Sequence, residues 1–165
     1  HTSCGRDWSS DVCSSDLRQR IQDSFDRQGF MTLIGGELTL LEPGICEVAV
    51  DYSPGLAQQK GFFHGGVIGT LGDTACGYAA YSLMAAQDSL LTVEYKLNIM
   101  GPGDGERLSA RASVVRAGAR LTICEGRVYN EKGGIKKECG LITATMMRLP
   151  QTSDMPSDTP TDMPD

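Results

Sequence analysis

The sequence predicts an α+β fold in which an antiparallel sheet wraps round one long, buried helix. The segment 58–81 has apolar residues all round its helical axis, so it lacks the polar face of a surface helix. Farther along, four segments alternate apolar and polar residues and are separated by short turns that contain glycine: 90–100, 106–117, 120–130 and 135–148. Short turns join antiparallel neighbours, so these four segments are expected to form successive strands of one sheet.

The predicted central helix has an unusual composition. Five glycines lie within it: Gly65, Gly66, Gly69, Gly72 and Gly77. Each destabilises an ordinary helix by about 1 kcal/mol relative to alanine, and here they would let a sheet approach the helix backbone closely. The segment also carries Asp73 and lacks the ~18 consecutive apolar residues of a membrane span. We therefore expect a helix wrapped by its own protein, with no membrane contact.

The segments before this helix predict one short helix and a hairpin. Residues 18–28 place Ile21 and Phe25 one turn apart, which is typical of an amphipathic helix that ends at the following glycine. Residues 31–42 and 45–52 are expected to be two strands joined by a Pro-Gly turn, with an irregularity at a double glycine in the first.

Regular alternation in the strand predicted at 90–100 assigns its residues to two faces. One face is apolar and carries Val93, Tyr95, Leu97 and Ile99. The other is polar and carries Thr92, Glu94, Lys96 and Asn98. We expect the polar face to be solvated or to contact another subunit.

The two ends of the chain differ from the rest. Residues 1–17 contain a repeated Ser-Ser-Asp and resemble the conceptual translation of a sequencing adapter, so we exclude them from the fold and expect the native start to be missing. Residues 150–165 are rich in Ser, Thr, Asp and Pro and are predicted to be disordered. A single domain over residues 18–149 remains.

Charge and cysteine usage restrict the class of protein. The net charge of −6 arises at the two ends, since residues 18–150 carry 14 acidic and 14 basic residues without a block of like charge. Nothing therefore favours nucleic-acid binding. Four cysteines fall in apolar segments without C-x-x-C spacing: Cys46, Cys76, Cys124 and Cys139. Buried free thiols and the lack of a secretory signal predict a cytoplasmic protein.

Two features of the central helix point to chemistry. Gly65 and Gly66 lie near its start, where unpaired N–H groups and the positive dipole end favour an oxyanion or a polarised carbonyl. Asp73 is a lone carboxylate in an apolar helix, which is costly unless it is paired or used. Eight residues separate Gly65 from Asp73, about 12 Å along the axis. One small reacting group cannot touch both, so a joint role would require a dimer with its site at the interface.

Residues 64–79, HGGVIGTLGDTACGYA, resemble the H-G-G-x(6)-D-x-A-x-G-x-A signature of hotdog-fold acyl-CoA thioesterases, and most closely the phenylacetate-pathway branch. Residues 92–103 and 116–120 resemble that family's third strand and its fourth-to-fifth strand hairpin. The resemblance covers roughly residues 20–149. It implies a homodimer or homotetramer (dimer of dimers) that hydrolyses acyl-CoA and needs no cofactor, since coenzyme A is part of the substrate.

The same resemblance assigns roles to individual residues. The Gly65 N–H would polarise the thioester carbonyl, and Asp73 of the partner subunit would be nucleophile or general base. Gln58 falls near the reacting carbonyl or the lytic water, and His64 would orient the helix start. A further set is expected to meet the substrate, with Thr74 or Gly77 at the acyl pocket and the arginines at the phosphates of coenzyme A: Gly66, Thr74, Gly77, Arg116 and Arg120.

Plainer readings stay open for several of these residues. His64 is the single histidine in residues 18–150, so a structural role at the helix start suits it, and neither a histidine metal site nor a Ser-His-Asp triad is expected. Arg116 and Arg120 also fit ordinary surface charges of a hairpin. Gly72 stands where related sequences often carry Ala. A non-catalytic acyl-CoA-binding module and an acyl-CoA hydratase are the rival functions, and the acyl group is left open.

Overall fold

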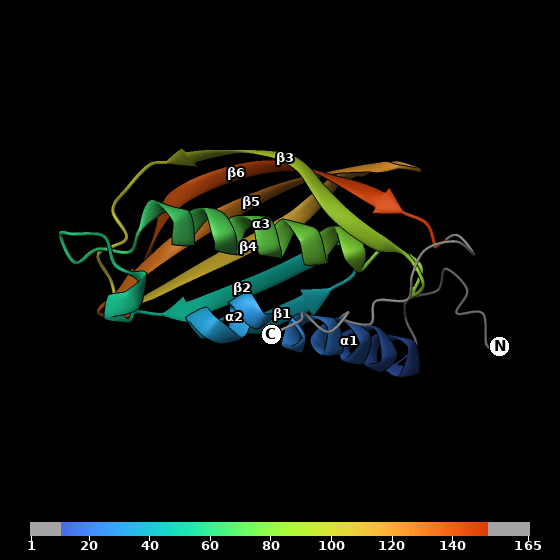
Figure 1. The fold of residues 1–165 in the computed structure, drawn as a ribbon, viewed down its shortest axis with the longest axis horizontal. Helices are drawn as coiled ribbons and strands as arrows, with labels where there is room; N and C mark the ends of the chain where they lie inside the picture. The colour runs from blue at the N-terminus through green and yellow to red at the C-terminus, as the bar shows by residue number, and fades with distance from the viewer. Residues whose placement is uncertain (1–10, 152–165) are drawn as a thin grey trace, which may run out of the picture.

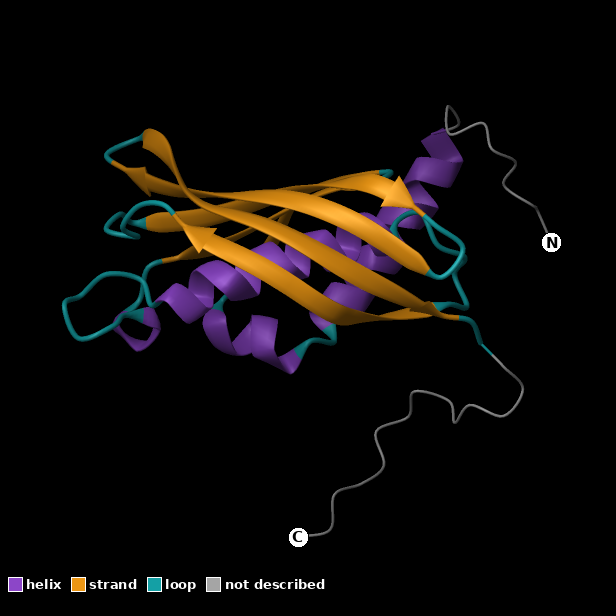
Figure 2. Ribbon diagram, turned by 90° about the horizontal axis from the view of Figure 1, so that it is seen from above, coloured by secondary structure: helices purple, strands orange, loops and turns teal. Residues whose placement is uncertain are grey.

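The computed structural model describes residues 11–151, and its order of elements confirms the α+β prediction. The elements are α1 (Asp11–Asp26), α2 (Gly29–Ile34), β1 (Glu37–Glu42), β2 (Ile45–Asp51), a 3-10 turn (Pro54–Leu56), α3 (Gly65–Tyr81), β3 (Ser89–Ile99), β4 (Arg107–Ala117), β5 (Leu121–Lys132) and β6 (Ile135–Leu149). The strands form one antiparallel sheet in the order β1-β2-β4-β5-β6-β3. The helices lie on one side of this sheet, with α3 across its concave face (Figures 1 and 2).

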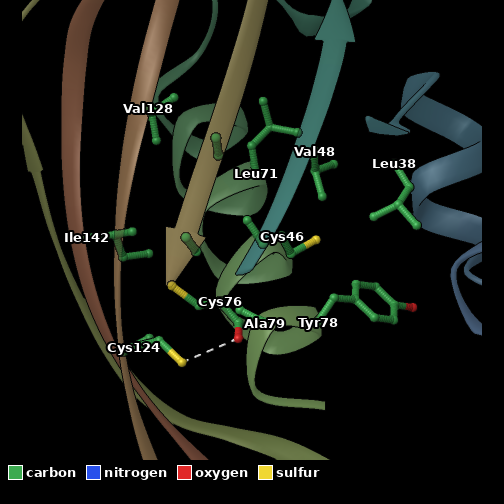
Figure 3. Close-up of a cluster of buried hydrophobic side chains, with 14 of the residues drawn as sticks. Leu38, Cys46, Val48, Leu71, Cys76, Tyr78, Ala79, Cys124, Val128 and Ile142 are labelled. Carbon is green, nitrogen blue, oxygen red and sulfur yellow. Dashed lines mark hydrogen bonds between the residues drawn. The ribbon is translucent and has the colours of Figure 1, made fainter. Parts of the chain in front are cut away.

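Helix α3 is the centre of the hydrophobic core (Figure 3). Its buried side chains include Ile68, Leu71 and Cys76, and the sheet curves round them. The predicted close approach of helix and sheet is confirmed at Gly72, where an added Cβ would lie 3.0 Å from Ile142 of β6. A methyl group there would force the helix or Ile142 to move.

Helix α3 begins later than predicted. Residues 58–64 form a loop with a tight turn, because Gly61 has φ +83° and its N–H donates to the Gln58 carbonyl at 2.9 Å. An isolated bridge between Ala57 and Phe63 closes the loop. The helical stretch is therefore Gly65–Tyr81, which places Gly65 at its first turn.

The region before β1 also differs from the prediction. Residues 29–34 form the short helix α2 instead of part of a strand, and Gly35 ends it with φ +74°. Such a left-handed residue is a common helix end, and its N–H satisfies helix carbonyls. Helix α1 starts at Asp11, earlier than predicted, and buries Leu17, Ile21 and Phe25 at four-residue spacing. The predicted origin of residues 1–17 as an adapter sequence stays a prediction.

Strand β3 contains a bulge that the sequence did not reveal. Its register with β6 shifts between Thr92 and Glu94. Beyond the bulge Tyr95 and Leu97 approach the helix, since a Cβ on Gly69 would lie 3.4 Å from the Tyr95 hydroxyl and 3.5 Å from Leu97. Before the bulge Thr92 also reaches the helix. Placing Thr92 on the polar face with Glu94 was therefore wrong, because one extra residue reverses the alternation.

The cysteine prediction is confirmed for the four cysteines in apolar segments, which are free and buried: Cys46, Cys76, Cys124 and Cys139. No helix in residues 11–151 is long and apolar enough to cross a membrane. The tail predicted to be disordered lies outside the described residues, apart from its first two positions.

Candidate active site

The start of α3 presents a single free backbone donor. His64 is the N-cap residue, with φ −61° and ψ 139°, and its Nδ1 accepts a hydrogen bond from the Gly66 N–H at 2.8 Å. His64 therefore caps the helix, which is the structural role considered for it. This hydrogen bond also uses the Gly66 N–H, which is no longer free to bind a ligand. Gly65 is the first helical residue, and its N–H makes no hydrogen bond to any of residues 11–151. This leaves the Gly65 N–H available at the positive end of the helix dipole.

Gln58 braces the loop that leads into this helix start. Its Oε1 accepts from the Lys60 N–H, and its backbone N–H donates to the Phe62 carbonyl at 2.8 Å. The His64 N–H in turn donates to the Leu56 carbonyl at 2.8 Å, which ties the loop to the 3-10 turn. The structure thus places Gln58 and His64 in one loop that fixes the position of Gly65.

Asp73 lies in the middle of α3 and is half-buried. Its Oδ1 accepts a hydrogen bond from the Thr92 hydroxyl of β3 at 2.8 Å. Burial raises the pKa of the Asp73 carboxyl above its ordinary value, while the Thr92 hydrogen bond lowers it in part. A carboxylate with a raised pKa and one fixed oxygen is suited to accept a proton or to attack an electrophile.

Thr92 is the site residue that sequence reasoning missed. Alternation assigned it to the outer face of the strand, and the bulge that turns it inward has no signature in the residues around it. A threonine hydroxyl is a suitable partner for a buried carboxylate such as Asp73. Its proximity to Asp73, however, becomes apparent only when the register of β3 is known.

A cavity of about 670 Å³ lies beside Asp73. Helix α3 lines it with a stripe of residues spaced three or four apart: Thr70, Asp73, Thr74, Gly77, Tyr78 and Tyr81. One wall comes from β3 and the end of β6, and the other comes from the junction of α1 and α2. Three predicted site residues, Asp73, Thr74 and Gly77, therefore line the same cavity.

The other predicted site residues lie elsewhere in the chain. Gln58, His64, Gly65 and Gly66 are at the opposite end of α3 from Tyr81 and do not line the cavity. About 12 Å of helix separates Gly65 from Asp73, as the residue count indicated.

The two predicted phosphate-binding arginines are exposed and do not line the cavity. Arg116 lies near the end of β4, and Arg120 lies in the following turn, where its carbonyl accepts from the Arg148 N–H at 2.7 Å. Arg148 also pairs with Asp88 of the cavity wall, with Nε and Oδ2 2.5 Å apart. The hairpin therefore adjoins the cavity rim through Arg148. Within residues 11–151, no cluster of His, Cys, Asp or Glu could hold a metal ion.

Replacing Asp73 by Asn is expected to raise the melting temperature at neutral pH. Burial raises the pKa of this carboxyl above 3.8, so the folded state holds its proton more tightly than the unfolded state. The cost of ionisation is then fully present above the folded-state pKa and disappears below the unfolded-state value. Thermal melts from pH 4 to pH 8 should show the difference from wild type growing with pH. A difference that shrinks with rising pH would contradict this account.

Comparison with known proteins identifies the family of this chain. Residues 60–137 match the thioesterase superfamily. The crystal structure of a thioesterase family protein from Silicibacter pomeroyi is 41% identical, covers 82% of this chain and 99% of that chain, and superposes with a TM-score of 0.80. The chain belongs to the thioesterase superfamily. The hotdog fold inferred from residues 64–79 is thereby confirmed.

Other members of the thioesterase superfamily are more distant. The PaaI protein from the phenylacetic acid degradation operon of Escherichia coli shares the fold, with 19% identity, a TM-score of 0.75 and coverage of 84% of this chain and 97% of that chain. The medium/long-chain acyl-CoA thioesterase YigI of Escherichia coli is 24% identical over 118 residues, which covers 62% of this chain and 76% of YigI.

Proposed function

We propose that this member of the thioesterase superfamily hydrolyses acyl-CoA thioesters to a free acid and coenzyme A. The observation that supports the proposal is the position of the Asp73 carboxylate. It is half-buried, accepts a hydrogen bond from Thr92 and lines the cavity of about 670 Å³. The relationship to an acyl-CoA thioesterase supports the choice of substrate. The reaction needs no cofactor, and the four buried free thiols suit a reducing, cytoplasmic setting.

The Gly65 N–H would bind the thioester carbonyl oxygen. Negative charge grows on that oxygen as the carbonyl is attacked, so a donor fixed at a helix N-terminus stabilises the transition state more than the ground state. One such donor contributes about 2.7–4 kcal/mol in known hydrolases. His64 and Gln58 would act indirectly by holding the loop that positions Gly65.

Asp73 would act by one of two routes. In the first, its carboxylate attacks the thioester carbon, the coenzyme A thiolate leaves, and water hydrolyses the resulting mixed anhydride. In the second, Asp73 takes a proton from water, and the hydroxide attacks the same carbon while the thiolate leaves. Both routes require the ionised carboxylate, so activity should rise as pH rises through the pKa of Asp73.

The separation of Gly65 from Asp73 favours a site shared between two copies of the chain. Strand β3 is an edge of the sheet within the described protomer, and Leu91, Val93 and Ile99 on it are each about half exposed, at 54%, 54% and 53%. An exposed apolar edge strand is a ready site for pairing with another chain. A homodimer, or a dimer of dimers, would place Gly65 of one copy near Asp73 of the other.

The function is tested by release of free thiol from a panel of aryl-acetyl, hydroxylated aryl and medium-chain acyl-CoAs, with molar mass measured in parallel. Thiol release by a dimer or tetramer is the expected result. Binding without thiol release would favour the non-catalytic acyl-CoA-binding module, and loss of an enoyl-CoA without thiol release would favour the hydratase.

Replacing Thr92 by Val is expected to move the acidic limb of the pH–activity profile to higher pH. The Thr92 hydroxyl stabilises the ionised form of Asp73, so its loss raises the pKa of that carboxyl further. The profile of kcat/KM against pH measures this shift. Thr92→Ser should restore the limb, and Thr143→Val, at an exposed position of β6, should leave it in place. An unshifted limb in Thr92→Val would show that the hydrogen bond does not tune the catalytic group.

A further inference from the structure

The cavity has a polar cluster at some distance from Asp73. The Tyr78 hydroxyl accepts a hydrogen bond from Gln28 Nε2 at 2.9 Å and lies 3.3 Å from Ser24 Oγ. Ser24 belongs to α1, Gln28 lies between α1 and α2, and Tyr78 belongs to α3, and all three line the cavity. The polar cluster is therefore built from two helices, α1 and α3, and from the link between α1 and α2.

The polar cluster keeps hydrogen-bonding atoms that its own internal bonds do not use. The Tyr78 oxygen accepts from Gln28, and either Tyr78 or Ser24 can donate in the hydrogen bond between their two oxygens. The Gln28 Oε1 makes no hydrogen bond to the rest of residues 11–151, so it can accept one from a ligand. Burial raises the pKa of Tyr78, so the phenol is neutral at physiological pH. A neutral group that both donates and accepts, such as a hydroxyl, complements this cluster.

The cavity leads from Asp73 to the polar cluster. Tyr78 is five residues beyond Asp73 on α3, about 7.5 Å along the axis. Gly77 lies between them and faces Leu90, which would be 3.9 Å from a Cβ at that position. The missing side chain leaves room for an acyl chain to pass along the helix.

We propose that Gln28 and Tyr78 determine specificity by binding a hydroxyl group at the far end of the acyl chain. This inference rests on the proposed function, since it places the acyl group in the cavity beside Asp73. The charged groups of the same cavity have other positions or partners. Arg27 also lines the cavity and is exposed, as Gln28 is, whereas Asp88 is paired with Arg148. A carboxylate-terminated chain would therefore seek Arg27 instead of the polar cluster.

The test separates binding from hydrolysis by using S-alkyl-CoA thioethers, which cannot be hydrolysed. Pairs with and without a terminal hydroxyl on chains of six, eight and ten carbons are compared by calorimetry. In at least one pair the hydroxylated analogue should bind about three- to tenfold more tightly, the range of one net neutral hydrogen bond.

Two variants assign that preference to the polar cluster. Gln28→Met and Tyr78→Phe should each bring the ratio of the two Kd values close to one. Tyr78→Phe retains the ring contacts with Phe25 and Tyr81, whose centroids lie 5.7 and 6.4 Å away, so the fold should persist. Gln22→Met is the matched control, because the Gln22 amide lies on α1 and bonds Asp26 outside the cavity. It should keep the wild-type ratio.

The outcomes distinguish this inference from the proposed function. Equal Kd values within every pair, or a preference that survives both variants, would overturn the inference. A stronger preference for a carboxylate-terminated analogue that disappears in Arg27→Met would also overturn it. Thiol release from the matching acyl-CoAs tests the function separately, so a hydroxyl preference without thiol release would sustain the inference and refute the hydrolase.

Discussion

Replacing Asp73 by Ala or Asn is expected to lower kcat/KM for acyl-CoA hydrolysis by roughly 10²–10⁴-fold. This is the range that a positioned general base contributes, and loss of a nucleophile has at least that effect. Asn retains the size of the side chain and can still accept the hydrogen bond from Thr92, so its loss of activity would report charge and not packing. Thiol release at saturating and limiting substrate measures the effect.

The control for Asp73 is Glu94→Gln, a carboxyl of the same sheet edge that contacts Thr145 on the outer face. It should retain wild-type activity. Molar mass should show that the Asp73 variants keep the wild-type assembly state, and thermal melts should show that they remain folded. Full activity in Asp73→Asn would exclude both the nucleophile and the general-base routes and leave Asp73 a structural role.

Replacing Gly65 by Pro is expected to lower kcat by about 10²–10³-fold, the effect of removing one oxyanion donor. Proline lacks the N–H and carries its ring Cδ in place of the amide hydrogen, and the first helical position tolerates it well. His64 already has the extended conformation that proline requires of its predecessor. An added Cβ would lie 3.0 Å from Ile99 Cδ1, the flexible end of a side chain.

Gly65→Ala is the matched control, since it adds the same Cβ and keeps the N–H. A large loss in Pro together with a small loss in Ala assigns the effect to the donor. Equal losses would show that crowding of Ile99 is responsible.

Mixing the two inactive variants tests whether the site is shared. If Gly65 and Asp73 of different copies form each site, a dimer of one Asp73→Ala chain and one Gly65→Pro chain contains one intact site. Random exchange should then restore about a quarter of wild-type activity in a symmetric dimer. Both residues acting from one chain would give no restoration.

The sequence predicted the fold well because its main signals are local. A buried helix within 58–81 and the four alternating strands could be identified from periodicity, and Gly72 of α3 does permit the close approach to Ile142. Helix α2 was missed because six residues are fewer than two helical turns, too few to show a helical repeat. Its end also depends on the left-handed backbone of Gly35.

The site could be predicted only where it follows the helix. The family resemblance assigned Asp73, Thr74 and Gly77, and their helical spacing agrees with the one cavity that all three line. Thr92, Gln28 and Ser24 come from other elements, and their positions depend on a bulge and on how α1 and α2 pack against α3. Pairings over such sequence distances leave no periodic signal.

The bulge in β3 makes the length of that strand as important as its composition. Thr92 and Tyr95 face the same helix although an odd number of steps separates them. Losing one residue between them would restore strict alternation and turn either the Asp73 contact or the packing of Tyr95 and Leu97 away from the helix. In the history of this sequence, substitutions along the strand are therefore expected to be far more common than insertions or deletions within it.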